Sequence, residues 1–170
     1  MSKLLPSTHK KVVVRKMDKG LVKGFVKPGG YLSAEGIEFL DLEGHVVSLP
    51  FDQIKGVYFV REFEGLPEHR ERKVFKSRPR LNGLWVRMRF KDAEVLDGLI
   101  SENLLEHDSR GYAVAPPDVN SNNLRIFVPR TALASVEVVG VVSNGSRRPA
   151  PRASSKVSKS QAETRQFGLF

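Results

Sequence analysis

The chain has 170 residues, 40% of them hydrophobic, and a formal net charge of +9, as expected for a globular protein of one or two small domains. No apolar run is long enough to span a bilayer as a helix, and the first residues lack the apolar stretch of a secretion signal. The absence of cysteine excludes disulfides and cysteine-ligated metals, and it favours a reducing compartment, here the cytoplasm.

The first part of the chain predicts a compact antiparallel unit of short strands. After a flexible N-terminus (residues 1–9), β-rich runs are punctuated by Gly and Pro, and no stretch shows a sustained helical period. The expected strands are 12–16, 21–26, 37–42, 45–49 and 56–60. Turn signals separate them, for example Asp18-Lys19-Gly20. We therefore expect a first β-barrel repeat over residues 10–63.

Residues 64–82 form an irregular basic linker. Basic side chains close to Phe75 and Trp85 are typical of a surface that contacts a phosphate backbone or a nucleotide. The candidate contacts are Arg72, Lys73, Lys76, Arg78 and Arg80. The simpler interpretation, which the sequence favours, is an inter-domain connector that crosses the surface with its charges in water.

Residues 83–142 predict a second unit of the same kind, with strands at 84–90, 94–100, 111–115, 124–128 and 135–142. The two halves share patterns that indicate an internal duplication. The matching patterns are Asp18-x-x-Leu21-Val22-x-Gly24 with Asp92-x-x-Val95-Leu96-x-Gly98, and Pro50-x-x-x-Ile54-x-x-Val57 with Pro129-x-x-x-Leu133-x-x-Val136. A longer gap between these anchors in the second half places an insertion in residues 101–123.

Each half has the predicted order of two strands, a loop, a strand pair, a one-turn helix and a closing strand. This order resembles small SH3-like or Sm-like barrels. The expected fold class is therefore all-β, with two tandem small barrels made by internal duplication and a disordered basic C-terminal tail. The two units should pack together, because a unit of this size buries little surface alone.

Three segments of these units resemble an uncharacterised bacterial family. They begin at Ile54, Phe90 and Pro117, and their sequences are IKGVYFVREFEG, FKDAEVLDG and PDVNSNNLRIFV. The resemblance covers roughly residues 10–142. Ala93 stands where the family usually has glycine in an Asp-Gly-Glu turn. The resemblance implies a fold but no activity.

The sequence shows no enzyme signature, because it lacks a cysteine nucleophile, a Gly-x-Ser-x-Gly turn, a phosphate-binding loop and a dinucleotide fingerprint. The histidines are scattered, and His107, between Glu106 and Asp108, is best explained by a polar loop. We expect a non-enzymatic protein without catalytic residues, metal ligands or cofactors. A PilZ-like module that binds a cyclic dinucleotide is the alternative. Against it, Lys76-x-x-x-Arg80 replaces the arginine pair of PilZ domains, and their Ser-Gly element is missing.

Residues 143–165 are rich in Ser, Pro, Ala, Arg and Lys without apolar periodicity, which predicts a disordered basic linker. Residues 144–170 carry six basic side chains and one acidic side chain. A basic arm of this kind is attracted to DNA or RNA, and its candidate contacts are Arg147, Arg148 and Arg152. The alternative is a solvated linker that its charge keeps soluble.

The sequence ends with Gln166-Phe167-Gly168-Leu169-Phe170, where apolar side chains follow a polar stretch and call for a pocket on a partner. The pattern Gln-x-x-Leu-Phe resembles the peptide by which DNA-maintenance proteins bind the bacterial sliding clamp. The resemblance implies that Gln166 makes polar contacts at the rim of the site. It also implies that Leu169 and Phe170 fill an apolar pocket, with Phe167 where leucine is common. Docking onto the chain's own body, or recognition by a protease or chaperone, are the alternatives.

The leading expectation is a cytoplasmic adaptor, able to associate with the nucleoid, that binds the sliding clamp in DNA replication or repair. Its partners would be the clamp, DNA through the basic tail, and a further protein at the barrels, with no membrane. The second expectation is a regulatory ligand-binding or nucleic-acid-binding β-barrel module whose basic linker makes the contacts.

Overall fold

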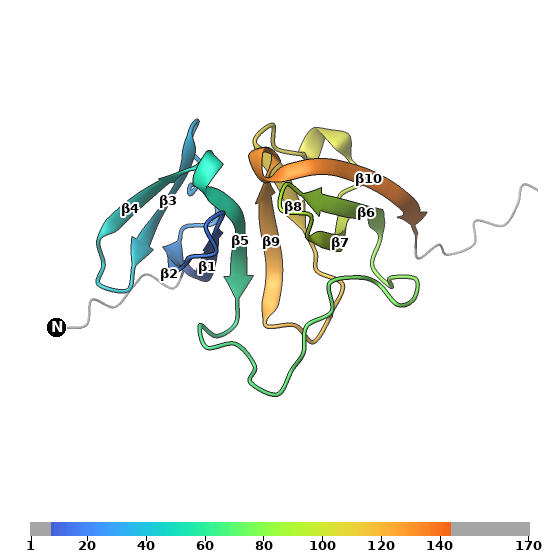
Figure 1. The fold of residues 1–170 in the computed structure, drawn as a ribbon, viewed down its shortest axis with the longest axis horizontal. Helices are drawn as coiled ribbons and strands as arrows, with labels where there is room; N and C mark the ends of the chain where they lie inside the picture. The colour runs from blue at the N-terminus through green and yellow to red at the C-terminus, as the bar shows by residue number, and fades with distance from the viewer. Residues whose placement is uncertain (1–7, 144–170) are drawn as a thin grey trace, which may run out of the picture.

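The computed structural model describes residues 8–143, which form an all-β fold of two sheets (Figure 1). The all-β class predicted from the sequence is confirmed. The first half contains β1 (Lys10–Lys16), β2 (Leu21–Val26), β3 (Gly36–Asp41), β4 (Val46–Pro50), the 3-10 turn η1 (Phe51–Gln53) and β5 (Ile54–Val60). The second half contains β6 (Gly83–Phe90), β7 (Val95–Ile100), η2 (Leu104–Glu106), β8 (Gly111–Val114), β9 (Asn123–Pro129), η3 (Arg130–Ala132) and β10 (Leu133–Val142). No helix in this part of the chain is long and apolar enough to cross a membrane.

Alternation of apolar and polar side chains explains the strands. On β6, Val86, Met88 and Phe90 are buried, whereas Arg87 and Arg89 between them are not. Successive side chains of a strand point to opposite faces, so this pattern buries one face and leaves the other to polar contacts.

The larger sheet has the strand order β4-β3-β2-β1-β5-β9-β8, and the smaller sheet has the order β10-β6-β7. The antiparallel pairing of β5 with β9 joins the two halves, and these strands lie side by side in the centre of Figure 1. A single bridge between Leu99 and Ala115 links β7 to the end of β8. Neither sheet closes on itself within residues 8–143, so the predicted pair of tandem small barrels is not confirmed there. The edges of β5 and β9 pair between the halves instead of closing a barrel within each half.

The strand register of the first half recurs in the second. Val12↔Gly24 in the first half corresponds to Val86↔Gly98 in the second. In the same way Gly36↔Pro50 corresponds to Gly111↔Pro129, and Phe25↔Leu40 corresponds to Leu99↔Ala115. The turns also match, because Lys19 has φ 71° and Ala93 has φ 69°. A positive φ favours glycine, so alanine at position 93 is strained at that turn.

Each half has its own hydrophobic core, and the β5·β9 ladder lets each half contribute to the core of the other. Phe127 of β9 belongs to the core of the first half, where its ring lies 6.1 Å from that of Tyr31 in an edge-to-face contact. Tyr58 of β5 packs against the core of the second half. Burial of a side chain as large as Phe127 contributes about 1.5–3 kcal/mol, so the two cores stabilise the joint.

A buried lysine adds an ionic contact across the same joint. Lys55 on β5 is only 5% exposed, and its Nζ donates to Asp92 at 2.5 Å and to Glu94, which both belong to the β6–β7 turn. Burial by itself lowers the pKa of Lys55, but the hydrogen bonds to Asp92 and Glu94 outweigh it and raise the pKa above its ordinary value. Lys55 therefore remains charged and ties the first half to the turn of the second.

The close packing of β7 on β8 gives a first testable prediction. A Cβ atom added at Gly98 would lie 2.1 Å from Cγ1 of Val114, which is far below a normal contact. We expect Gly98→Ala to lower the free energy of unfolding by about 1–3 kcal/mol, the usual effect of overpacking. Urea unfolding measures the effect. Gly29→Ala is the matched control, because a Cβ there meets no atom within 4 Å. Equal stabilities of the two variants would contradict this packing.

Candidate nucleic-acid interface

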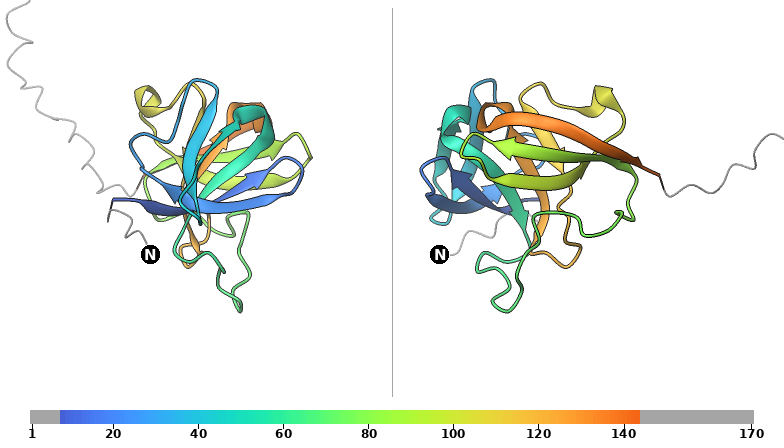
Figure 2. Two further views of the ribbon diagram at one scale, coloured as in Figure 1. Left: turned by 90° about the vertical axis from the view of Figure 1, so that its left-hand side faces the viewer. Right: turned by 45° about the vertical axis from the view of Figure 1, so that its right-hand side comes forward.

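The linker, residues 64–82, runs beyond the ends of β5 and β9 and is held against the loop before β9 (Figures 1 and 2). Asn122 fixes the chain just before the linker. Its Nδ2 donates to the backbone oxygen of Glu62 at 2.8 Å, and its Oδ1 accepts from the backbone N–H of Glu62 at 3.0 Å. Nε2 of His69 lies 2.6 Å from Oδ2 of the buried Asp118. The polar loop that carries Asp118 and Asn122 thus fixes the path of the linker.

Asp97 on β7 makes the second attachment. Its backbone N–H donates to the carbonyl of Lys73 at 2.7 Å. Its fully buried carboxylate accepts from Arg87 at 2.7 and 3.0 Å and from Nε1 of Trp85 at 3.1 Å. Burial raises the pKa of Asp97, but the hydrogen bonds from Arg87 and Trp85 outweigh it, so the pKa lies below its usual range. Trp85 packs edge-on against Phe75 with ring centres 5.4 Å apart, so these two rings hold the linker in place.

Four of the basic residues predicted from the sequence gather around one groove of about 440 Å³. They are Arg72, Lys76, Arg78 and Arg80, and the apolar lining includes Val74, Leu81 and Val119. All four basic side chains are exposed, and within residues 8–143 no hydrogen bond or ion pair engages them. Phe75 also lines the groove, which therefore combines positive charge with an aromatic ring, as sites for single-stranded nucleic acids do.

Lys73, the fifth predicted linker residue, is used differently. Its Nζ lies 2.5 Å from Oε1 of Glu94, which also binds Lys55. The two lysines hold the pKa of Glu94 below its usual range, although burial opposes the shift. Lys73 thus neutralises an acid of the second half and is not free to contact phosphate.

A second cleft, of about 510 Å³, lies between β1, β5 and the linker. Arg15 lines it and donates to the hydroxyl of Tyr58 at 3.4 Å. Glu64 and Glu71 also line it, so the cleft carries charges of both signs and suits a polyanion less well. This cleft could not be predicted from the sequence, because Arg15 stands inside an ordinary strand pattern.

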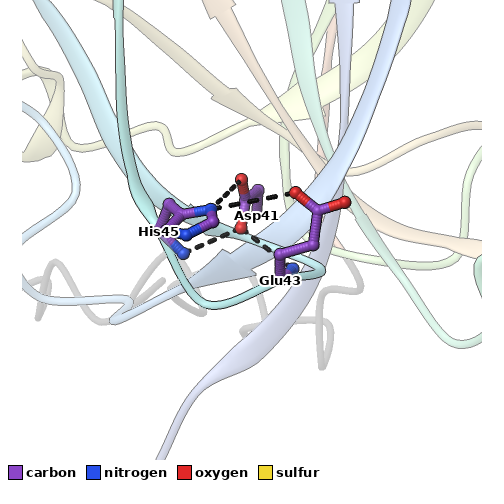
Figure 3. Close-up of side chains that lie close together, drawn as sticks. All are labelled: Asp41, Glu43 and His45. Carbon is purple, nitrogen blue, oxygen red and sulfur yellow. Dashed lines mark hydrogen bonds and ion pairs between the residues drawn. The ribbon is translucent and has the colours of Figure 1, made fainter.

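Three metal-ligand-type side chains meet at the tip of the β3–β4 hairpin, a group that sequence analysis did not identify (Figure 3). Nδ1 of His45 lies 3.4 Å from Asp41 and 3.8 Å from Glu43. Oδ1 of Asp41 already accepts the backbone N–H groups of Glu43 at 2.9 Å and His45 at 2.8 Å. These hydrogen bonds lower the pKa of Asp41 and close the turn. Turn formation therefore explains the cluster.

The remaining predicted site residues lie outside the described part of the chain. They are the tail residues Arg147, Arg148 and Arg152 and the clamp-type residues Gln166, Phe167, Leu169 and Phe170.

The Asp97 attachment gives a prediction about pH. A carboxylate whose folded pKa is lowered stabilises the fold above its unfolded pKa of about 4, and this contribution is lost as pH falls through the folded pKa. We therefore expect Asp97→Asn to destabilise the protein at pH 7 by about 1.5–3 kcal/mol, the range for hydrogen bonds to charged groups. The difference in free energy of unfolding between Asp97→Asn and wild type, measured from urea unfolding curves, should become smaller below pH ~4. A difference of the same size at about pH 2 would contradict an ionised Asp97 as the anchor.

Comparison with known proteins gives a family but no activity. No curated protein matches the chain, and no solved structure matches it either. The match to a family of unknown function, DUF6982, extends over residues 8–140, that is, over both halves and the linker between them. The expectation of an uncharacterised family is thereby confirmed, and the chain belongs to the DUF6982 family.

Proposed function

We propose that this protein is a non-enzymatic adaptor that binds the bacterial DNA sliding clamp through residues 166–170, in DNA replication or repair. The observation that carries the proposal is the pattern Gln166-x-x-Leu169-Phe170, which follows a strongly basic segment. In the proposal, Gln166 makes the polar contact and the two apolar side chains occupy the pocket. The body of the adaptor is a pair of SH3-like or Sm-like units, a description that the shared strand register supports.

Two apolar anchors supply only a modest affinity once the cost of ordering the peptide is subtracted. The expected dissociation constant is therefore on the order of micromolar. The basic residues Arg147, Arg148 and Arg152 would add affinity when DNA passes through the clamp, because both contacts then act together.

Calorimetric titration of the full-length chain with purified sliding clamp tests this function. We expect Leu169→Ala and Phe170→Ala each to weaken binding at least tenfold, because each removes about 1.5–3 kcal/mol of apolar burial. Phe167→Leu is the matched control and should bind at least as well as wild type, since leucine is common at that position. No heat of binding with wild type, or equal affinities of the alanine variants and wild type, would refute the proposal.

A second function is favoured by the groove on the linker. Its basic side chains are exposed and have no hydrogen-bond or ion-pair partner among residues 8–143, and with the apolar walls they suit the phosphates and bases of a single-stranded nucleic acid or a nucleotide. This function does not depend on residues 166–170, so the two proposals can fail separately.

Fluorescence anisotropy with a labelled single-stranded oligonucleotide tests the groove. We expect the double variant Arg78→Glu/Arg80→Glu to weaken binding more than tenfold and to flatten its salt dependence, because two phosphate contacts are lost. The double variant Lys27→Glu/Lys91→Glu makes the same change in net charge at exposed sites away from the groove and should bind nearly as well as wild type. Deletion of residues 166–170 should have little effect. Equal losses in both double variants would show that net charge alone attracts the oligonucleotide. A cyclic dinucleotide that competes for the site would instead favour the PilZ-like alternative.

A further inference from the structure

Two sheet edges are left unpaired among the described residues. The strand β4 pairs only with β3, and β10 pairs only with β6. Both edges are apolar: Val46 on β4 is 70% exposed and Val138 on β10 is 61% exposed. Exposed edges usually carry lysines or inward-pointing charges that prevent pairing with another chain. Here β4 has no charged residue and β10 has only Glu137.

The joint inside the chain shows which strands these edges fit. Each half contains five strands in the same order. The fourth strands are therefore β4 and β9, and the fifth, closing strands are β5 and β10. The β5·β9 ladder therefore pairs a closing strand with a fourth strand. The two unpaired edges are the other closing strand, β10, and the other fourth strand, β4.

We propose that a second copy of this chain docks at these edges, with β10 of one copy pairing antiparallel to β4 of the next in the register of the β5·β9 ladder. That ladder pairs Val57 with Phe127, Tyr58 with Ile126 and Phe59 with Arg125. For the closing strands β5 and β10, the equivalent residues follow from their pairing with β1 and β6, in which Val14↔Val57 corresponds to Met88↔Val136. For the fourth strands β4 and β9, the equivalent residues follow from Gly36↔Pro50 and Gly111↔Pro129.

The equivalent pairs between copies follow directly. They are Val136 with Ser48, Glu137 with Val47, and Val138 with Val46 of the second copy. The register thus places two exposed valines opposite each other. In the chain's own ladder this place is held by Phe59 and Arg125, and the guanidinium of Arg125 lies 4.6 Å from the ring centre. Side chains at this pair do touch, so the two valines would cover each other.

The contact between copies should be weaker than the joint within the chain. Side-chain hydrogen bonds across the internal joint include those of Thr131, which donates to the carbonyl of Phe51 at 3.0 Å, and of Arg110, which donates to that of Ser33 at 2.8 Å. The equivalents of Thr131 and Arg110 in the first half are Asp52 and Glu35, whose carboxylates cannot donate. Assembly should therefore be reversible and depend on concentration. A head-to-tail contact of this kind produces rings when the rotation closes and open chains when it does not.

Cysteine cross-linking of the full-length chain tests the register. The natural sequence has no cysteine, so Val46→Cys and Val138→Cys each introduce a unique thiol. After mild oxidation of an equimolar mixture of the two variants, we expect a disulfide between positions 46 and 138 that mass spectrometry identifies. It should form several-fold faster than in a mixture of Val46→Cys with Leu105→Cys, a matched control at a 95% exposed position.

Other outcomes overturn the proposal. Disulfides mainly between two copies of position 138, or two copies of position 46, would show symmetric edge pairing in place of head-to-tail docking. A rate equal to that of the control would show that the edges do not meet. Sedimentation gives the second readout: the average mass of wild type should rise with concentration, and Val138→Lys should abolish the rise while the urea midpoint stays unchanged. A wild-type protein that is monomeric at every concentration would refute docking.

Discussion

The antiparallel ladder between β5 and β9 sets two halves of the chain against each other, and most other features follow from its register. At one end of the ladder Val60 pairs with Asn123, so the chain leaving β5 and the loop entering β9 start beside each other. The linker therefore meets that loop at once, and Asn122 and Asp118 can hold it. At the other end η1 and η3 meet, where Thr131 bonds to Phe51. The basic groove is a consequence of this ladder, because one side of the groove comes from the linker and the other from the loop.

The ion pairs near the joint determine which charges remain available. Glu62 pairs with Lys11 at 2.8 Å, and Glu64 pairs with Lys23 at 2.9 Å. Exposed pairs of this kind contribute little stability, at most about 1 kcal/mol each. Their effect is on the electrostatic field instead: lysines of the first half neutralise Glu62, just before the linker, and Glu64, at its start. Within residues 8–143, no ion pair engages Arg78 or Arg80 at its end, so these arginines keep their positive charge there.

The strands could be predicted from the sequence because period-two alternation and turn residues are local signals. The duplicated patterns even fixed the equivalence of the halves, since Gly24 and Gly98 hold the same place in matching ladders. The β5·β9 pairing could not be predicted, because it joins residues far apart and no local pattern encodes which edges meet. For the same reason Lys55 gave no sign of burial. Asp97 looked like an ordinary polar residue of a strand, yet it is completely buried and its backbone N–H bonds to the linker carbonyl of Lys73.

The differences between the two halves run against what solvent exposure alone predicts. If β4 and β10 ended their sheets in water, a charged residue would be expected at the edge positions and an apolar one inside the joint. The chain does the reverse. Arg125 occupies the pair inside the joint, and its equivalent on the open edge is Val46. On the closing strands the paired Phe59 corresponds to the exposed Val138. A duplicated chain with one internal joint always leaves one closing strand and one fourth strand unpaired. Pairing of these two edges between copies explains the valines at positions 46 and 138.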